Sequence, residues 1–259
     1  MSHIAISVGN SSTQLAAMVD GQPAAPPQRI NNGSLDNLAG VLRTFADLLN
    51  KQDHAPTVIA SVAPDICKQV TKSIKSVMNG TIYFIREDIP LPLKLEVENP
   101  ETVGVDRVLC AAAAYHQLKR SCVVADFGTA LTIDAVSEKG IFLGGAIMPG
   151  LQIAADALHE RTAALPRVVP SVPPRDSVPL GRNTTEAIEI GLYVGYQGMI
   201  REVIERYATA MGHWPSVIAT GGDAPLFAAG CPWIDRVVEE LPLLGIALAY
   251  DRFAKNRRL

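Results

Sequence analysis

The feature that most constrains the fold is a repeat in which the second half of the chain resembles the first. Residues 4–13 (IAISVGNSST) align on their glycine with residues 123–132 (VVADFGTALT). Each copy has an apolar run, a glycine turn and a second strand-like run, the pattern of two strands joined by a tight turn. Two hairpins can also look alike by chance. As a repeat, the halves predict two lobes, residues 1–120 and 121–259, with a cleft between them.

Both halves continue with alternating strands and helices. In the first half, the residue pattern predicts strands over 3–8, 13–18, 57–62 and 82–85, and helices beginning at Ser34 and Pro64 and over 106–119. In the second half, it predicts a helix after Thr184 and strands over 122–126, 131–136 and 216–219. This order predicts an α/β protein whose mixed sheets carry helices on their faces.

Charge and composition exclude several classes of protein. The formal net charge of −3 argues against a chain that mainly covers nucleic acid. The apolar stretch without a charged residue at 140–155 contains four glycines and a proline and is too short to span a bilayer. The N-terminus has no signal-peptide pattern, and the four cysteines include no Cys-x-x-Cys pair. We therefore expect a cytoplasmic protein whose partners include neither nucleic acid nor membrane.

Three glycine turns follow strand-like runs directly and are candidate phosphate sites. They contain Gly9, Gly128 and the segment 219–223 (ATGGD). Consecutive N–H groups at such turns form a concavity for anions, and three of them together suit a nucleoside triphosphate. Each turn alone could also be an ordinary tight turn. The chain has no Gly-x-x-x-x-Gly-Lys-[Ser/Thr] segment, which excludes a P-loop kinase.

Two aspartates are candidates for chemistry. Asp106 lies at the start of the predicted helix, where it could cap the helix or act as a general base beside Arg107. Asp126 ends a strand of apolar residues, and a carboxylate there is costly to bury unless it meets a cation or good donors. Asp126 is therefore a candidate residue of a cation or phosphate site.

The helix after Thr184 carries a stripe of glycines at Gly191, Gly195 and Gly198. Each glycine inside a helix costs about 1 kcal/mol relative to alanine. The stripe indicates that another backbone packs closely there, either within the same subunit or from a second one.

Several motifs in order along the chain resemble those of type III pantothenate kinases, in the acetate and sugar kinase/Hsc70/actin superfamily. The matching segments are 99–107 (NPETVGVDR), 124–130 (VADFGTA), 143–150 (LGGAIMPG), 165–167 (LPR), 181–184 (GRNT) and 220–222 (TGG). The resemblance implies a duplicated ribonuclease-H-like (actin-like ATPase) fold, two lobes each with a mixed central sheet flanked by helices, and a homodimer. It also implies phosphorylation of pantothenate by ATP to 4'-phosphopantothenate in coenzyme A biosynthesis, with Mg²⁺ and a monovalent cation, ammonium or potassium.

Carried over by position, the resemblance assigns a role to each matching residue. Asp106 would be the base that accepts the hydroxyl proton, and Asp126 would hold the monovalent cation. The pantothenate site would contain Gly104, Val105, Asp106, Arg107 and Thr184. The ATP site would contain Ser7, Val8, Gly9, Asn10, Ser11, Ser12, Thr13, Gln14 and Thr129.

One departure from the family pattern lies in the first glycine turn. Members normally open with Asp-x-Gly-Asn-Thr, and Ser7 occupies the place of that aspartate. A serine supplies no carboxylate to Mg²⁺, a hard cation usually held by one or two carboxylates and by phosphates. An alternative hypothesis is therefore a pantothenate-kinase-like protein of weak or no activity with a regulatory or accessory role. A kinase for another small hydroxyl substrate is a third.

Overall fold

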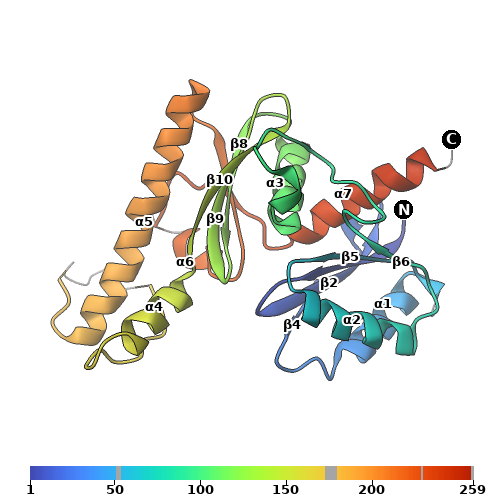
Figure 1. Cartoon of the computed structure of the whole chain (residues 1–259), viewed down its shortest axis with the longest axis horizontal. Coiled ribbons are helices and arrows are strands. Elements are labelled where there is room, and N and C mark those ends of the chain that lie inside the picture. Colours follow the sequence, from blue (N-terminus) through green and yellow to red (C-terminus); the bar gives the residue numbers. More distant parts are fainter. Residues whose placement is uncertain (51–53, 173–179, 229, 258–259) are drawn as a thin grey trace. The chain divides into compact units, whose positions relative to one another are not determined.

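The computed structural model describes residues 1–50, 54–172, 180–228 and 230–257 (Figure 1). They form two compact units. Unit 1 comprises Met1–Gln117 and Glu240–Leu259, and unit 2 comprises Leu118–Glu239. Each unit contains a mixed sheet with helices, so the predicted α/β fold class is confirmed.

Unit 1 is built on a sheet with the strand order β3-β2-β1-β5-β6, in which β4 also pairs with β2. The β1–β2 pair is antiparallel, whereas β1–β5 and β5–β6 are parallel. The strands of this sheet are β1 (His3–Val8), β2 (Ser12–Val19), β3 (Gln22–Pro23), β4 (Gln28–Asn31), β5 (Thr57–Ser61) and β6 (Ile82–Phe84). The short β7 (Lys94–Leu95) lies in unit 1 outside this sheet. The helices of unit 1 are α1 (Leu38–Leu48), α2 (Pro64–Val77), the 3₁₀ helix η2 (Pro100–Thr102), α3 (Val105–Leu118) and α7 (Leu241–Asn256).

The two faces of strand β1 bury different partners because successive side chains point to opposite faces of the sheet. Ile4, Ile6 and Val8 join the core formed with α1 and α2. His3, on the other face, has its ring centroid 4.5 Å from that of Tyr250 in α7. Helix α1 begins at Leu38, later than the predicted Ser34 cap, because the Ser34 hydroxyl donates to Asp36 instead (3.3 Å).

Unit 2 has the strand order β12-β11-β8-β9-β10. The β8–β9 and β9–β10 pairs are antiparallel, and β8–β11 and β11–β12 are parallel. Its strands are β8 (Cys122–Phe127), β9 (Ala130–Val136), β10 (Ile141–Pro149), β11 (Ser216–Thr220) and β12 (Arg236–Val237), and its helices are α4 (Leu151–Glu160), α5 (Thr184–Met211) and α6 (Ala224–Ala228). Side chains from all three helices pack with one face of β8 and β9 into a single core.

The repeat predicted from the sequence is present as topology. In each unit an antiparallel hairpin, β1–β2 or β8–β9, has a parallel strand beside its first member, β5 or β11. Ser7 and Asp126 occupy equivalent places, each one residue before the end of the first strand.

The C-terminal helix differs from the predicted division at residues 120 and 121. Helix α7 belongs to unit 1, where it packs on β1, β2 and β5. A Cβ at Gly245 would lie 2.3 Å from the carbonyl oxygen of Leu109, so glycine is needed where α7 crosses α3. Among the described residues, no helix is both long enough and apolar enough to cross a membrane.

Candidate functional site

Asp106 lies in the first turn of α3, directly after the 3₁₀ helix η2. Since α3 begins at Val105, Asp106 is inside the helix rather than at the residue before it, and its Oδ1 accepts a hydrogen bond from the N–H of Arg107 at 2.8 Å. A Cβ at Gly104 would lie 2.6 Å from the same oxygen. Glycine at 104 therefore leaves room for the carboxylate, which would have to shift if residue 104 carried a side chain.

The electrostatics of Asp106 favour proton acceptance. Burial raises the pKa of this carboxyl above its usual value of 3.8, and the N–H and charge of Arg107 oppose that shift only in part. A carboxylate with a raised pKa is a stronger base. The geometry and the pKa direction thus support a general base at this position.

The first glycine turn joins β1 to β2, and a side chain from a distant segment holds it. The N–H of Gly9 donates to the carbonyl of Ser12 at 3.0 Å. Asn32 donates from Nδ2 to the carbonyls of Gly9 (2.8 Å) and Asn10 (3.0 Å), and its Oδ1 accepts from the Thr13 hydroxyl (2.8 Å). Because these bonds hold two backbone carbonyls and one side-chain hydroxyl, Asn32 sets the shape of the turn. The role of Asn32 was not predicted from the sequence, although the Asn-Asn-Gly run at 31–33 is a turn signal.

The structure brings all the predicted ATP residues of unit 1 into this one hairpin. Ser7 lies opposite Gln14 and is half-buried. Val8 and Thr13 are buried, so the hairpin offers their backbone rather than their side chains to a ligand. Asn10 and Ser11 are exposed at the tip.

In unit 2, the structure brings two of the three glycine turns together. Asp126, one residue before the end of β8, pairs with Thr220 of β11. Gly221 has a positive φ of 93°, and a Cβ there would lie 2.6 Å from Asp126 Oδ1 and 2.5 Å from the Phe127 carbonyl oxygen. The N–H of Asp223 donates to that same carbonyl at 3.2 Å. The half-buried Asp126 carboxylate therefore lies close to the backbone of residue 221, and only glycine at that position allows this approach.

Thr129 is exposed on the turn between β8 and β9. The carbonyl of Thr129 accepts from the N–H of Gly150 at 3.0 Å, and a Cβ at Gly150 would lie 2.4 Å from that oxygen. The residue before α4 thus braces this turn, as Asn32 braces the first one.

Thr184 is the first residue of α5 and is exposed. The preceding Asn183 accepts from the N–H of Glu186 (3.0 Å), and the Glu186 carboxylate accepts from the N–H of Arg182 (2.8 Å). This arrangement is a variant of the capping box, in which the carboxylate of Glu186 bonds the N–H of the residue before the N-cap. It fixes the start of α5 and so the position of Thr184.

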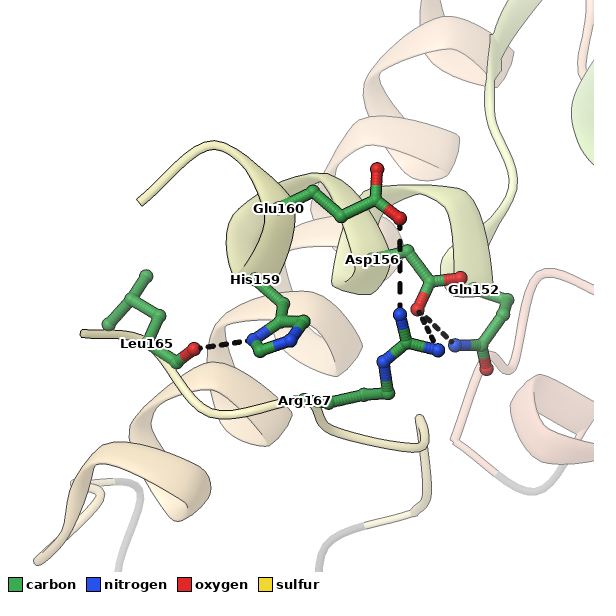
Figure 2. A network of polar contacts seen from close by, with 6 residues as sticks. All are labelled: Gln152, Asp156, His159, Glu160, Leu165 and Arg167. Carbon is green, nitrogen blue, oxygen red and sulfur yellow. Dashed lines mark hydrogen bonds and ion pairs between the residues drawn. The ribbon is translucent and has the colours of Figure 1, made fainter. Parts of the chain in front are cut away.

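The matched segment 165–167 is held to helix α4, as Figure 2 shows. The Leu165 carbonyl lies 2.8 Å from Nδ1 of His159. The Arg167 guanidinium lies 3.8 Å from Asp156 and 3.9 Å from Glu160. Exposed pairs of this kind contribute about 0–1 kcal/mol each, so the network orients the segment more than it stabilises unit 2.

A cation at Asp126 would depend on ligands other than acidic, histidine or cysteine side chains of this chain. Within the described ranges, no group of three or more His, Cys, Asp and Glu side chains could hold a metal ion. One half-buried carboxylate fits a cation that takes its other ligands from backbone and phosphate oxygens.

Comparison with known proteins identifies the class and then the family. The activator of 2-hydroxyisocaproyl-CoA dehydratase from Clostridium difficile, with bound ADPNP, aligns with a TM-score of 0.50 and 10% identity over 100% of this chain and 97% of its own. The (R)-2-hydroxyglutaryl-CoA dehydratase component A from Acidaminococcus fermentans gives a TM-score of 0.54 and 12% identity over 98% and 99%. The chain therefore has the actin-like ATPase fold, as predicted.

The family follows from the sequence comparisons. The family model described as type III pantothenate kinase matches residues 3–206. The type III pantothenate kinase of Moorella thermoacetica is 37% identical over 84% of this chain and 85% of its own. That of Anaeromyxobacter sp. strain Fw109-5 is 35% identical over 96% and 98%. The chain belongs to the type III pantothenate kinase family.

Proposed function

We propose that this protein transfers the γ-phosphoryl group of ATP to the hydroxyl of pantothenate, in the cytoplasm, as a step of coenzyme A biosynthesis. The observation that carries the proposal is Asp106: a carboxylate with a raised pKa beside Arg107, in a segment shaped around Gly104. The names of the relatives support an active kinase over the accessory-protein alternative.

Asp106 accepts the proton of the attacking hydroxyl, which makes its oxygen a better nucleophile. Arg107 offers a fixed positive charge to the carboxylate of pantothenate. Gly104, Val105 and Thr184 complete the substrate site, with Thr184 contributing its exposed hydroxyl. Since phosphoryl transfer depends mainly on positioning and charge neutralisation, these residues act by holding the acceptor in line with the phosphate.

The two hairpins are proposed to hold ATP. In unit 1 the backbone of residues 8–13 and the side chains of Ser7 and Gln14 face the nucleotide, and in unit 2 Thr129 does so. Asp126 would hold the monovalent cation, and Mg²⁺ would come with the phosphates of ATP. Both cations would neutralise charge on the transferred group.

The glycine stripe of α5 is proposed to be a homodimer contact. Among the described residues, nothing lies within 4 Å of a Cβ placed at Gly191, Gly195 or Gly198, so packing within the subunit does not explain the stripe. Val194 and Met199 are also exposed on this helix, at 54% and 41%. A closed two-fold interface would use the same stripe on both subunits.

The test of the dimer is the mass in solution of the wild type and of Gly195→Leu. Leucine at this exposed position should leave the subunit folded but separate the two copies. In a two-fold contact each subunit contributes one leucine, so the steric clash occurs twice. Light scattering should give twice 27.7 kDa for the wild type and a lower mass for the variant on dilution. A wild-type mass of one subunit at every concentration would contradict the proposal.

A coupled ADP-release assay tests the kinase activity itself. It contains pantothenate, Mg²⁺ and either ammonium or potassium, with the wild type beside Ser7→Asp. We expect turnover by the wild type and tighter use of Mg²⁺ by Ser7→Asp, because the added carboxylate is a preferred Mg²⁺ ligand. Absence of turnover by the wild type at millimolar ATP would contradict the proposed function.

A further inference from the structure

Arg86 has a backbone conformation that is unfavourable for its residue type. Its φ is +82°, in the left-handed region that favours glycine. It lies in a tight turn after β6, where its N–H donates to the carbonyl of Ile89 at 2.7 Å and the Asp88 carboxylate accepts from the N–H of Phe84 at 2.8 Å. A residue held in such a conformation against its preference often serves a site.

The side chain of Arg86 binds the segment that leads into Asp106. Its Nη1 donates to the carbonyls of Pro100 (3.2 Å) and Glu101 (2.6 Å), and its Nη2 donates to the carbonyl of Val103 (2.8 Å). These carbonyls belong to the 3₁₀ helix η2 and the residue after it. Such carbonyls have no partner within their own helix, and a cation there interacts favourably with the helix dipole.

The bond to Val103 also fixes Gly104. The carbonyl of Val103 and the N–H of Gly104 belong to one planar peptide group, and the described chain has no cis peptide bond. The two groups therefore point in opposite directions, so the Gly104 N–H points away from Arg86. A charged donor on the carbonyl also polarises this N–H and makes it a stronger hydrogen-bond donor.

We propose that Arg86 is a positioning residue that sets the peptide planes of residues 100–104 and thereby presents the Gly104 N–H and the Asp106 carboxylate to the acceptor substrate. The inference rests on the proposed function for its kinetic part. Arg86 does not touch the substrate. It acts through the backbone of residues 100–103. Its own left-handed conformation in the turn after β6 directs its side chain towards these carbonyls.

Three variants at one position separate positioning from stability. Arg86→Gly removes the guanidinium and relieves the backbone, whereas Arg86→Ala removes it and keeps the unfavourable φ, so Gly should be the more stable of the two. Arg86→Lys keeps a charge without the planar fork. The matched control is Arg252→Ala, which removes an arginine bond to the carbonyl of Pro92 (2.5 Å) elsewhere in unit 1.

Kinetics and hydrogen exchange provide independent readouts. We expect Gly and Ala at 86 to raise the pantothenate KM equally, by about tenfold, because both lose the same charge-assisted bonds. The KM for ATP should not change, Lys should restore part of the loss, and Arg252→Ala should leave both constants unaltered. Amide exchange at Thr102, whose N–H donates to Asn99 at 3.2 Å, should be faster in Arg86→Gly.

The outcomes distinguish the inference from the proposed function. A pantothenate KM that follows thermal stability, higher for Ala than for Gly, would overturn the positioning role, as would unchanged exchange at Thr102. If the wild type does not use pantothenate, the proposed function fails. The exchange experiment still decides whether Arg86 orders residues 100–104.

Discussion

The two hairpins that carry the candidate nucleotide residues have the same topology and different chemistry. In unit 1, Val8 pairs with Thr13 across the turn of residues 9–12, whereas in unit 2 Phe127 pairs with Leu131 across the shorter turn of residues 128–130. The first turn is held by the side chain of Asn32, and the second by backbone at Gly150. At the equivalent strand position, unit 1 has Ser7 and unit 2 has Asp126. The two units thus share one strand arrangement, but only unit 2 has a charged residue at this position.

The proposed proton acceptor, Asp106, lies outside both hairpins, and the largest effect is expected there. Asp106→Asn should lower kcat by about 10²–10⁴-fold while pantothenate still binds, because the amide cannot accept the proton. Turnover and calorimetric binding measure the two effects. The exposed Glu101→Gln, in η2, is the control and should keep full turnover. Full activity of Asp106→Asn would leave the aspartate a purely structural role in the first turn of α3.

The pH profile sharpens the same assignment. Because burial raises the pKa of Asp106, kcat/KM should fall on the acid side at a pH above 3.8. In Asp106→Asn the remaining activity should lose this acid limb. An acid limb that persists in the variant would assign the titration to another group.

The hairpins themselves are compared by Asp126→Asn and Ser7→Ala. We expect Asp126→Asn to lower turnover by about a hundredfold and to abolish the response to potassium or ammonium, because a fixed charge near the phosphates is lost. Ser7→Ala removes only a hydroxyl and should change turnover less than threefold, within about 0.6 kcal/mol. Equal losses in the two variants would show that the hairpins contribute alike.

A smaller difference between strands β1 and β8 concerns the pH dependence of folding stability. His3 in β1 aligns with Cys122 in β8. Burial lowers the pKa of His3 from 6.5 to about 3, and both ring nitrogens lack a hydrogen-bond partner within the described chain. The folded form therefore binds a proton less readily than the unfolded chain. The contribution of His3 to stability is present above pH 6.5 and is lost as the pH falls from 6.5 towards 3, by up to about 1.4 kcal/mol per pH unit.

His3→Phe should remove this acid sensitivity and keep the ring contact with Tyr250. Urea unfolding at pH 7 and pH 5 measures the difference, which is expected to be about 2 kcal/mol smaller in the variant. The control is His116→Gln, at an exposed position of α3. An unchanged pH dependence in His3→Phe would show that His3 does not govern the acid stability of unit 1.

The sequence predicted local structure well and long-range contacts poorly. Short apolar runs bounded by glycine turns predicted β1, β2, β8 and β9, because both signals are local properties of the sequence. The roles of Asn32 and Arg86 were not predicted, since each side chain binds backbone more than ten positions away. The resemblance assigned roles to Asp106 and Asp126. Only the structure shows that Gly104 and Gly221 lie beside their carboxylates.

The return of α7 to unit 1 has a consequence for how the protein is made. Unit 2 is one continuous stretch of chain, and all of it emerges from the ribosome before Leu241 does. Unit 1 has to wait, since Tyr250 covers His3 and Gly245 packs on Leu109 only after the last helix emerges. Domains usually fold during synthesis in order from the N-terminus. In this protein we expect the reverse order: unit 1, which begins the chain, finishes folding after unit 2.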